Sequence, residues 1–547
     1  MNKNVGILLG LASIAVSPWT TYDPINPLKL LMIGICGASC LVYLILNRNI
    51  TKVNRIVLVL SAVFVFQAFI ALLFSGSSIT QGFFGYYGRY FGFFTWFMLF
   101  IIMVYFSVGQ KIDYIVRVFL FVGSISMVYS LLQYLKRDPA PWDNYYATIF
   151  GFLGNPNFQS SFLGLYVISI CVGVIKNWGN KKKILFLLTI IIISMFLIFI
   201  SSSIQGFFVV SIGLMAILLY VLFAKQHYRT FWFSFTFGIL FVPLFIGGVI
   251  GAGPLASFLA KGTLASRGDY WVTAFFMAKA NLLTGVGPDQ YGTWYRFYRN
   301  SEALTRFNVD VTSDSAHNGY MDFAANLGVL ALITYVLLLI YALITASRYI
   351  KKQQEIDYTH AGLVAMFVSF QAQFLISPNQ LGLVIWGWVF LGALLGYGEM
   401  NGAESHLKLV EKHLTKSKLE VPNPFLGTES LLIGSLIGCL VTAPVIYSSM
   451  QFRTALVKSD ALVIITAANN WPRNDLTLNY TAKILFANNL QEQGFSLVNA
   501  GLREFPNSYD LWFTRMSYNK LTELERNEGI EQLHRLDPLN PQWKPRR

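Results

Sequence analysis

The stretch K-I-L-F-L-L-T-I-I-I-I-S-M-F-L-I-F-I-S, residues 183–201, contains no charged side chain after its first lysine. A helix of about 20 apolar residues crosses a hydrocarbon layer about 30 Å thick. A helix is also the usual way to satisfy backbone polar groups where water is absent. The stretch therefore predicts a membrane-spanning helix.

Runs of the same kind recur along the chain. The 547 residues are 55% hydrophobic, 16% aromatic and only 12% charged, too apolar for an ordinary soluble protein. We expect an all-α, polytopic membrane protein with about 13 transmembrane helices. Their approximate ranges are 4–21, 27–47, 54–75, 91–108, 113–135, 157–176, 183–201, 204–224, 231–252, 323–346, 359–376, 380–398 and 428–449. The first run lacks a small-residue cleavage site, so we expect it to be retained.

Basic residues fall on alternate short connections between these runs. Because loops rich in lysine and arginine stay in the cytoplasm, these connections are predicted to be cytoplasmic. They carry Arg48, Lys52 and Arg55; Lys176 and Lys181 to Lys183; Lys225 and Arg229; Arg348, Lys351 and Lys352; and Lys408 to Lys418. The N-terminus is therefore predicted inside and, with an odd number of spans, the C-terminus outside. The formal net charge of +14 follows largely from this asymmetry and requires no nucleic-acid partner.

Two segments lie outside the predicted spans. Residues 253–322 form an outward connection far longer than two helices need, and long loops of this kind are usually functional. Residues 451–547 lose the long apolar runs and carry more charge. We predict a transmembrane domain, 1–450, that includes the outward loop, and a separate extracytoplasmic helical domain, 451–547.

Three prolines punctuate the C-terminal segment. Pro472, Pro506 and Pro538 are separated by 34 and 32 residues, close to the tetratricopeptide period. A tetratricopeptide-like fold would suit docking of an acceptor or a partner, whereas a stabilising cap is the plainer alternative.

One histidine is predicted at the outer face of the membrane. His317 ends the outward loop and precedes a hydrophobic run, in S-A-H-N-G-Y-M-D-F from Ser315. Within a largely bilayer-spanning chain, such a titratable group favours a chemical role over an architectural one, although an interfacial histidine taken alone is more often a structural hydrogen-bonding residue than a base. Asp314 could orient its imidazole, and Asn318 follows it directly. We therefore treat His317 as a candidate general base.

Two arginines are candidate anion-binding residues. Arg89 lies in F-F-G-Y-Y-G-R-Y-F-G, and Arg267 begins R-G-D-Y-W-V. A planar guanidinium binds phosphate oxygens with two parallel hydrogen bonds, so the pair suits a pyrophosphate attached to a lipid. Either side chain could instead extend towards lipid headgroups. Asn155 and Asn157 could face a substrate, although capping the following helix is the commoner role.

The sequence resembles the O-antigen ligase and polymerase (Wzy-like) superfamily of bacterial membrane glycosyltransferases over about residues 80–400. The resemblance rests on G-N-P-N-F from Gly154, on Arg267 with Trp271, on L-L-T-G-V-G-P from Leu282, and on a histidine, ten residues and a glycine, His317 to Gly328.

The resemblance implies a GT-C type fold in the bacterial cytoplasmic (inner) membrane. It implies transfer of a glycan from a polyprenyl (undecaprenyl) pyrophosphate carrier to an acceptor hydroxyl at the outer face, with inversion and with neither metal nor cofactor. The acceptor could be a glycan, a lipid or a protein. His317 would be the base, and Arg267 and Arg89 would hold the pyrophosphate. Asn155, Asn157, Asp314 and Asn318 are further candidate substrate-binding residues.

Other functions stay open at this stage. Ala331 stands where ligases have Gly, Thr or Tyr, so a polymerase of lipid-linked repeat units remains an alternative, as does a protein O-oligosaccharyltransferase. A lipid or polysaccharide transporter or flippase is the alternative of another class, and ionisable groups inside the bilayer would favour it.

Overall fold

The computed structural model describes residues 2–47, 49–108, 112–142, 148–249, 252–259, 263–306, 308–411 and 424–544. Within these ranges the regular elements are helices and no strand occurs, which confirms the all-α prediction. Arg48 and the lysines predicted to be cytoplasmic between residues 412 and 418 lie outside the described residues.

Eight of the described helices are long and apolar enough to cross a membrane, so the chain is polytopic. They are α2 (Pro27–Leu46), α3 (Arg55–Phe74), α6 (Ile112–Tyr134), α7 (Pro156–Lys176), α8 (Lys181–Ile200), α9 (Gln205–Ala224), α16 (Val329–Lys352) and α19 (Pro424–Lys458). The other predicted spans coincide with α1 (Asn2–Ile14), α5 (Phe93–Ser107), α10 (Tyr228–Val249), α17 (Tyr358–Phe374) and α18 (Leu381–Glu411).

Two predicted spans differ from the structure. The first helix ends at Ile14 instead of residue 21, because the chain then turns and Ser17 N donates to Pro24 O at 2.7 Å. The span predicted at 323–346 is broken at Gly328 into α15 (Gly319–Leu327) and α16. Gly328 has a φ of +91°, and a Cβ at this position would lie 2.5 Å from the backbone of Leu283. The close crossing of two backbones therefore requires glycine.

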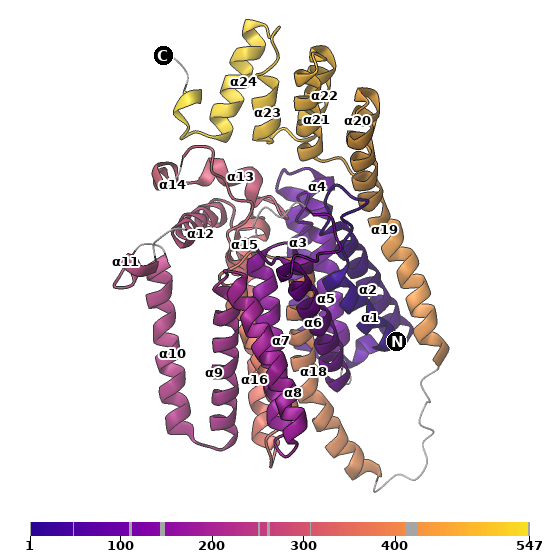
Figure 1. The fold of residues 1–547 in the computed structure, drawn as a ribbon, viewed down its shortest axis with the longest axis vertical. Coiled ribbons are helices and arrows are strands. Elements are labelled where there is room, and N and C mark those ends of the chain that lie inside the picture. Colours follow the sequence, from indigo (N-terminus) through magenta and orange to yellow (C-terminus); the bar gives the residue numbers. More distant parts are fainter. Residues whose placement is uncertain are drawn as a thin grey trace.

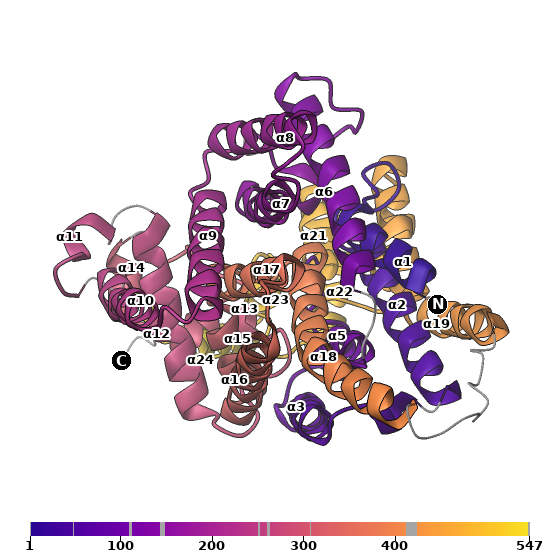
Figure 2. The same cartoon turned by 90° about the horizontal axis from the view of Figure 1, so that it is seen from below.

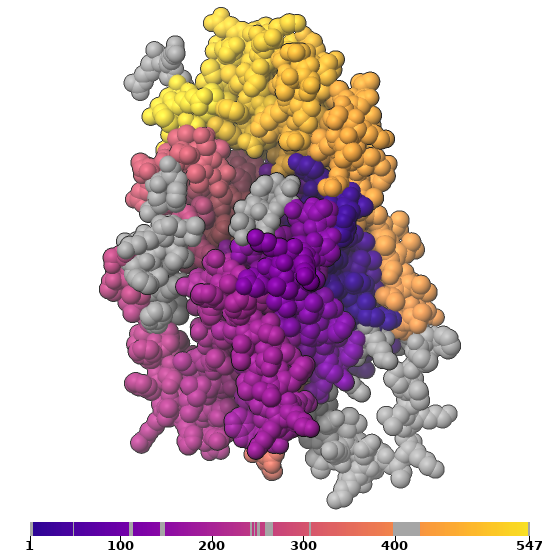
Figure 3. Space-filling model, in the orientation of Figure 1, coloured from indigo at the N-terminus to yellow at the C-terminus, as the bar shows by residue number. Residues whose placement is uncertain are grey.

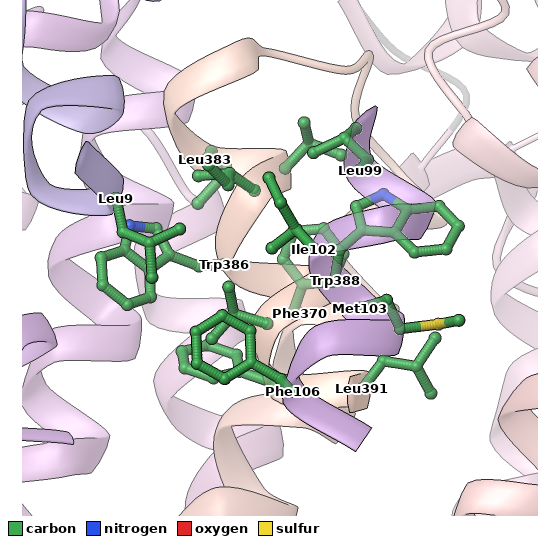
Figure 4. Close-up of a cluster of buried hydrophobic side chains, with 14 of the residues drawn as sticks. Leu9, Leu99, Ile102, Met103, Phe106, Phe370, Leu383, Trp386, Trp388 and Leu391 are labelled. Carbon is green, nitrogen blue, oxygen red and sulfur yellow. The ribbon is translucent and has the colours of Figure 1, made fainter. Parts of the chain in front are cut away.

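The centre of the membrane part is packed between α5 and α18. Trp386 and Trp388 of α18 are buried in the same hydrophobic cluster as Leu99 and Met103 of α5, and Figure 4 shows these side chains, with Trp386 beside Leu9 of α1. The indole Nε1 of Trp386 donates to Ser13 Oγ at 2.7 Å, so its polar atom is satisfied within apolar surroundings. In the view from below, α17 and α18 lie in the middle of the bundle, and α3, α8, α10 and α19 lie at its periphery (Figure 2).

The outward segment folds into a helical layer. It comprises α11 (Ala256–Leu259), α12 (Thr263–Ala280), α13 (Tyr291–Tyr298), α14 (Ser301–Arg306) and α15, and the short α4 (Ile79–Phe84) lies at the same end of the molecule (Figure 1). The segment L-L-T-G-V-G-P runs along the end of α15, where Val286 N donates to Ala325 O at 2.8 Å and Gly287 N donates to Asn326 O at 3.1 Å. These contacts fix the end of α15 relative to this segment of the outward layer.

The C-terminal helices have a hydrophobic cluster of their own, which includes Leu478, Val498, Leu511 and Leu533. They are α20 (Ala461–Ala468), α21 (Asp475–Ala487), α22 (Gln491–Glu504), α23 (Tyr509–Arg515) and α24 (Glu523–Leu536). Two helices fall between each pair of successive prolines, and the tetratricopeptide assignment stays a prediction. These helices form the uppermost layer in Figures 1 and 3.

A buried ion pair joins this C-terminal unit to the outward layer. Arg299 Nη2 lies 2.7 Å from both carboxylate oxygens of Asp537, and both side chains are almost fully buried. Arg296 stacks its guanidinium over the ring of Tyr509, 4.2 Å from the centroid. The unit is therefore held by specific contacts as well as by its link to α19.

The basic connections lie at the opposite end of the bundle from the outward layer. The turns from α7 to α8 and from α9 to α10, and the end of α16, are at the lower end of Figure 1, whereas α12, α13 and α15 are at the upper end. This arrangement matches the alternation of charge along the sequence. Which end faces the cytoplasm stays a prediction.

Candidate functional site

A rigid turn presents His317 at the start of α15. Asn318 is the N-cap of this helix, and its Oδ1 accepts from Tyr320 N at 3.1 Å and Met321 N at 3.2 Å. Asp322 Oδ1 reaches back and accepts from Ala316 N at 2.8 Å. His317 itself has a φ of +52°, a conformation that costs energy for a side chain other than glycine. The turn keeps this backbone because residues on both sides are tied to the helix.

The imidazole of His317 is surrounded by oxygens on one side. Its Nδ1 lies 3.3 Å from Ser315 Oγ, 3.4 Å from Ser315 O and 3.5 Å from Ser313 Oγ, and its ring packs 5.2 Å from that of Tyr270. Donation from Nδ1 to these oxygens would leave the Nε2 lone pair available. Burial lowers the pKa of His317, and the charge of Asp314 opposes the shift only in part. The imidazole is therefore neutral at neutral pH and can accept a proton.

The Arg89 guanidinium forms ion pairs with two carboxylates, those of Asp289 and Asp314. Its Nε lies 3.0 Å from Asp289 Oδ1, and its Nη1 lies 3.2 Å from Asp314 Oδ1. The other oxygen of Asp289 accepts from Tyr86 N at 2.9 Å and Phe91 N at 3.0 Å, so one buried carboxylate fixes both ends of the Arg89 loop. Burial alone would lower the pKa of Arg89, but the nearby carboxylates outweigh it and raise the pKa.

Arg267, in contrast, is buried without a counter-ion. It lies on α12 with 9% of its surface exposed, and among the described residues it forms neither an ion pair nor a hydrogen bond. Burial lowers the pKa of Arg267, and the opposing influence comes from Tyr270. The charge of Arg267 in turn lowers the pKa of His317. A buried guanidinium in this state is a ready site for an anion.

The structure brings most of the predicted residues together. Asp314 links them, because it pairs with Arg89 and its charge acts on His317. We expected Asp314 to orient the imidazole, but the two serines lie closest to Nδ1, whereas the Asp314 carboxylate bonds to Arg89. Asp314 is partly desolvated, which opposes its ionisation, yet the charges of Arg89 and His317 prevail and hold its pKa below the usual value. Asn318 contributes to the site as the N-cap of α15, the helix that begins beside His317.

Asn155 and Asn157 lie at the start of another helix. Asn155 is the N-cap of α7 and its Oδ1 accepts from Asn157 N at 2.8 Å, while Asn157 Oδ1 accepts from Ser203 Oγ at 2.8 Å. Within the part of the chain that the structure describes, no hydrogen bond or ion pair joins either residue to His317, Arg89 or Arg267. The geometry corresponds to the commoner capping role.

Three residues of the site were missed by sequence reasoning. They are Asp289, Asp322 and Asn379, which line a small pocket beside Arg89. Asp322 Oδ2 and Asn379 Oδ1 are buried without a hydrogen-bond partner among the described residues. Burial raises the pKa of Asp322 to about 7. Asp289 directly follows the G-V-G-P motif, and this proximity was the one available signal.

Comparison with known families agrees with this picture. Residues 188–336, from within α8 to the first turns of α16, match the model of a family described as O-antigen ligase. The match contains Arg267, Asp289, Asp314, His317 and Asp322, whereas Arg89 lies outside it. A search of curated proteins found no match. The family match confirms the resemblance to the O-antigen ligase and polymerase superfamily. It supports glycosyl transfer in general and, with the apolar helices, a bacterial inner membrane protein.

Proposed function

Because residues 188–336 match the O-antigen ligase family, we propose that this protein transfers a glycan from a polyprenyl pyrophosphate carrier to an acceptor hydroxyl at the outer face of the inner membrane. One observation carries the proposal. A neutral histidine on a rigid turn lies in the field of a buried arginine that lacks a counter-ion. This pairing supplies a base for the acceptor and a cation for the donor.

His317 would act on the acceptor. Its Nε2 takes the hydroxyl proton while the acceptor oxygen attacks the anomeric carbon and inverts it. The bond from that carbon to the pyrophosphate breaks, and its electron pair leaves with the polyprenyl pyrophosphate. General-base catalysis of this kind contributes roughly 10²- to 10⁴-fold in rate. The neighbouring Asp314 would stabilise the imidazolium that forms, because its charge favours the protonated ring.

Arg267 would act on the donor. Negative charge grows on the departing pyrophosphate as the bond breaks, and a guanidinium held in a site of low dielectric stabilises that charge strongly. Arg267 has all its donors available among the described residues, whereas Arg89 shares its donors with Asp289 and Asp314. We therefore assign the main contact with the pyrophosphate to Arg267 and a supporting role to Arg89.

Purified protein in nanodiscs tests the proposal directly. It is incubated with a polyprenyl-pyrophosphate glycan, with and without an acceptor, and the products are resolved by mass. His317→Ala should abolish transfer, whereas His227→Ala, an exposed histidine at the opposite end of the bundle, should leave it unchanged.

The products decide between the alternatives. Glycan on the added acceptor alone indicates a ligase, which includes a protein O-oligosaccharyltransferase where the acceptor is a protein. A ladder of glycan multiples without an acceptor indicates a polymerase. Transfer that persists in His317→Ala would contradict the role of the base, and no transfer under any condition would favour a transporter.

A further inference from the structure

A second cavity lies at the end of the bundle opposite the outward layer, the lower end of Figure 1. Its volume is about 440 Å³, and small-molecule sites usually have volumes of about 300–1,000 Å³. Its walls come from the end of α9, the end of α16, and the connection from α16 to the first residue of α17. α9 contacts both α16 and α17, and the three helices are neighbours in the view from below (Figure 2). The cavity is therefore far from His317 and has no part in the proposed chemistry.

This cavity lies at the depth of lipid headgroups. α9 and α16 are both long and apolar enough to cross a membrane, and both line the cavity with residues of their last turns, Ala224 and Ile350. Beyond these ends the lining includes the amides of Gln353 and Gln354. A site where two spans leave the hydrocarbon layer is in constant contact with phospholipids. A phospholipid is therefore the ligand with the highest local concentration there.

The cavity is held open by hydrogen bonds within the protein. Asp357, in the connection between α16 and α17, accepts from Thr359 N at 2.9 Å and His360 N at 3.1 Å through Oδ1, and from the Tyr349 hydroxyl at 2.9 Å through Oδ2. The hydroxyl of Tyr220, a buried residue of the lining, lies 3.0 Å from His360 Nδ1. A ligand would therefore meet a preformed site, which reduces the cost of ordering on binding.

Two opposite charges line the cavity without pairing. Lys225 follows the end of α9, and Glu355 lies in the connection between α16 and α17. Both side chains are exposed, and among the described residues neither forms a hydrogen bond or an ion pair. An ammonium group attracts a phosphate, whereas a carboxylate accepts hydrogen bonds from an amine. The lining thus matches a headgroup that carries both a phosphate and a primary amine.

We propose that this cavity binds the headgroup of phosphatidylethanolamine, with the lipid phosphate on Lys225 and the lipid ammonium on Glu355. Phosphatidylglycerol carries the phosphate without the amine. Phosphatidylcholine carries a quaternary amine, which has no N–H group to donate to a carboxylate. Each of these two lipids therefore satisfies one charge of the cavity fully and the other poorly. The inference does not depend on glycan transfer.

Native mass spectrometry of the full-length protein in detergent, titrated with one lipid at a time, tests the proposal. With identical acyl chains, phosphatidylethanolamine should bind roughly fivefold more tightly than either other lipid, the upper range for an exposed ion pair. Glu355→Gln should abolish the preference over phosphatidylcholine. Lys225→Gln should weaken all three lipids to a similar extent, because all three have the phosphate. Lys182→Gln, an exposed lysine in the first turn of α8, should bind as the wild type does.

Equal affinity of the wild type for phosphatidylethanolamine and phosphatidylcholine would overturn the proposal, as would a preference that persists in Glu355→Gln. Tightest binding of phosphatidylglycerol, lost in Lys225→Gln, would make the cavity a site for anionic lipids and overturn the contact with the amine. Soluble glycerophosphoethanolamine has the same headgroup chemistry and should fail to displace the lipid at equal concentration. Displacement would assign the cavity to a free phosphate ester and overturn the lipid assignment.

Discussion

Arg89 and Arg267 lie near the same histidine in opposite electrostatic surroundings. Arg89 bonds to Asp289 and Asp314, and its loop is tied at both ends to the Asp289 carboxylate. Arg267 lies on a helix and has neither a carboxylate partner nor a hydrogen bond among the described residues. A paired arginine contributes to the stability of the fold, whereas an unpaired buried one keeps its charge for a ligand. Substitutions should therefore separate the two roles.

Of the two arginine substitutions, Arg267→Ala should cause the larger loss of transfer. Removal of one preorganised donor to a developing charge typically lowers the rate roughly 10²- to 10³-fold. The free energy of unfolding should change little, because no partner of Arg267 within the described structure loses its charge compensation. Initial rates with polyprenyl-pyrophosphate glycan, together with thermal unfolding, measure both effects. Lys279→Ala, an exposed residue at the end of α12, is the matched control. Near-normal transfer by Arg267→Ala would contradict the assignment.

Arg89→Ala should reduce stability as well as transfer. Removing one partner of a buried ion pair costs about 3 kcal/mol or more, and the Asp289 side chain is only 3% exposed. Burial already raises the pKa of Asp289, and loss of Arg89 would raise it further. The folded state would then bind more protons than the unfolded state, so the deficit in unfolding free energy should grow as the pH rises above the ordinary carboxyl range.

The double variant Arg89→Ala with Asp289→Asn separates the two effects. It removes both charges, so unfolding midpoints should return towards those of the wild type while transfer stays low. Recovery of transfer together with stability would mean that Arg89 has no direct role with the substrate.

The sequence predicted the elements and residues that form a recognisable pattern. It did not predict the carboxylates that hold those residues in place. The long apolar runs predicted the helices, and the histidine-to-glycine spacing and the outward position selected His317. Asp289 and Asp322 were missed because a carboxylate in a loop or in a first helical turn is ordinary in a sequence. Their importance comes from tertiary contacts with Tyr86, Phe91 and Ala316.

The span boundary at Gly328 was missed for a related reason. The apolar run continues through this glycine without a charge, so hydropathy alone predicts one helix. The break comes from the Leu283 backbone, which crosses the chain here and is distant in sequence. Gly285 of the G-V-G motif lies against the backbone of Asn326, and Gly328 lies against that of Leu283, so the two motifs meet at the same backbone crossing.

Asp322→Asn should alter the pH dependence of stability by a moderate amount. Burial raises the pKa of this carboxyl from 3.8 to about 7, so the stability contributed by its protonation is present below the unfolded value and is lost as the pH rises through about 7. Asparagine keeps an oxygen for Ala316 N and cannot ionise. The variant should therefore gain stability over the wild type at about pH 8 compared with about pH 5. If the unfolding midpoints of the variant and the wild type differ by the same amount across that pH range, another group compensates the charge of Asp322.

Asp314→Asn should have the smallest effect, and it tests whether Arg89 acts on His317 through a shared carboxylate. The Asp314 side chain is 54% exposed, so its charge is partly screened and its loss should lower transfer less than roughly tenfold. Asp314 raises the pKa of His317, and without it the pKa should fall. Because the base must be neutral, the acid limb of the pH–rate profile should move to lower pH, while the plateau falls since a weaker base accepts the proton less readily. An acid limb that stays in place would show that Asp314 serves only to hold Arg89, and the two arginines would then act on the histidine independently.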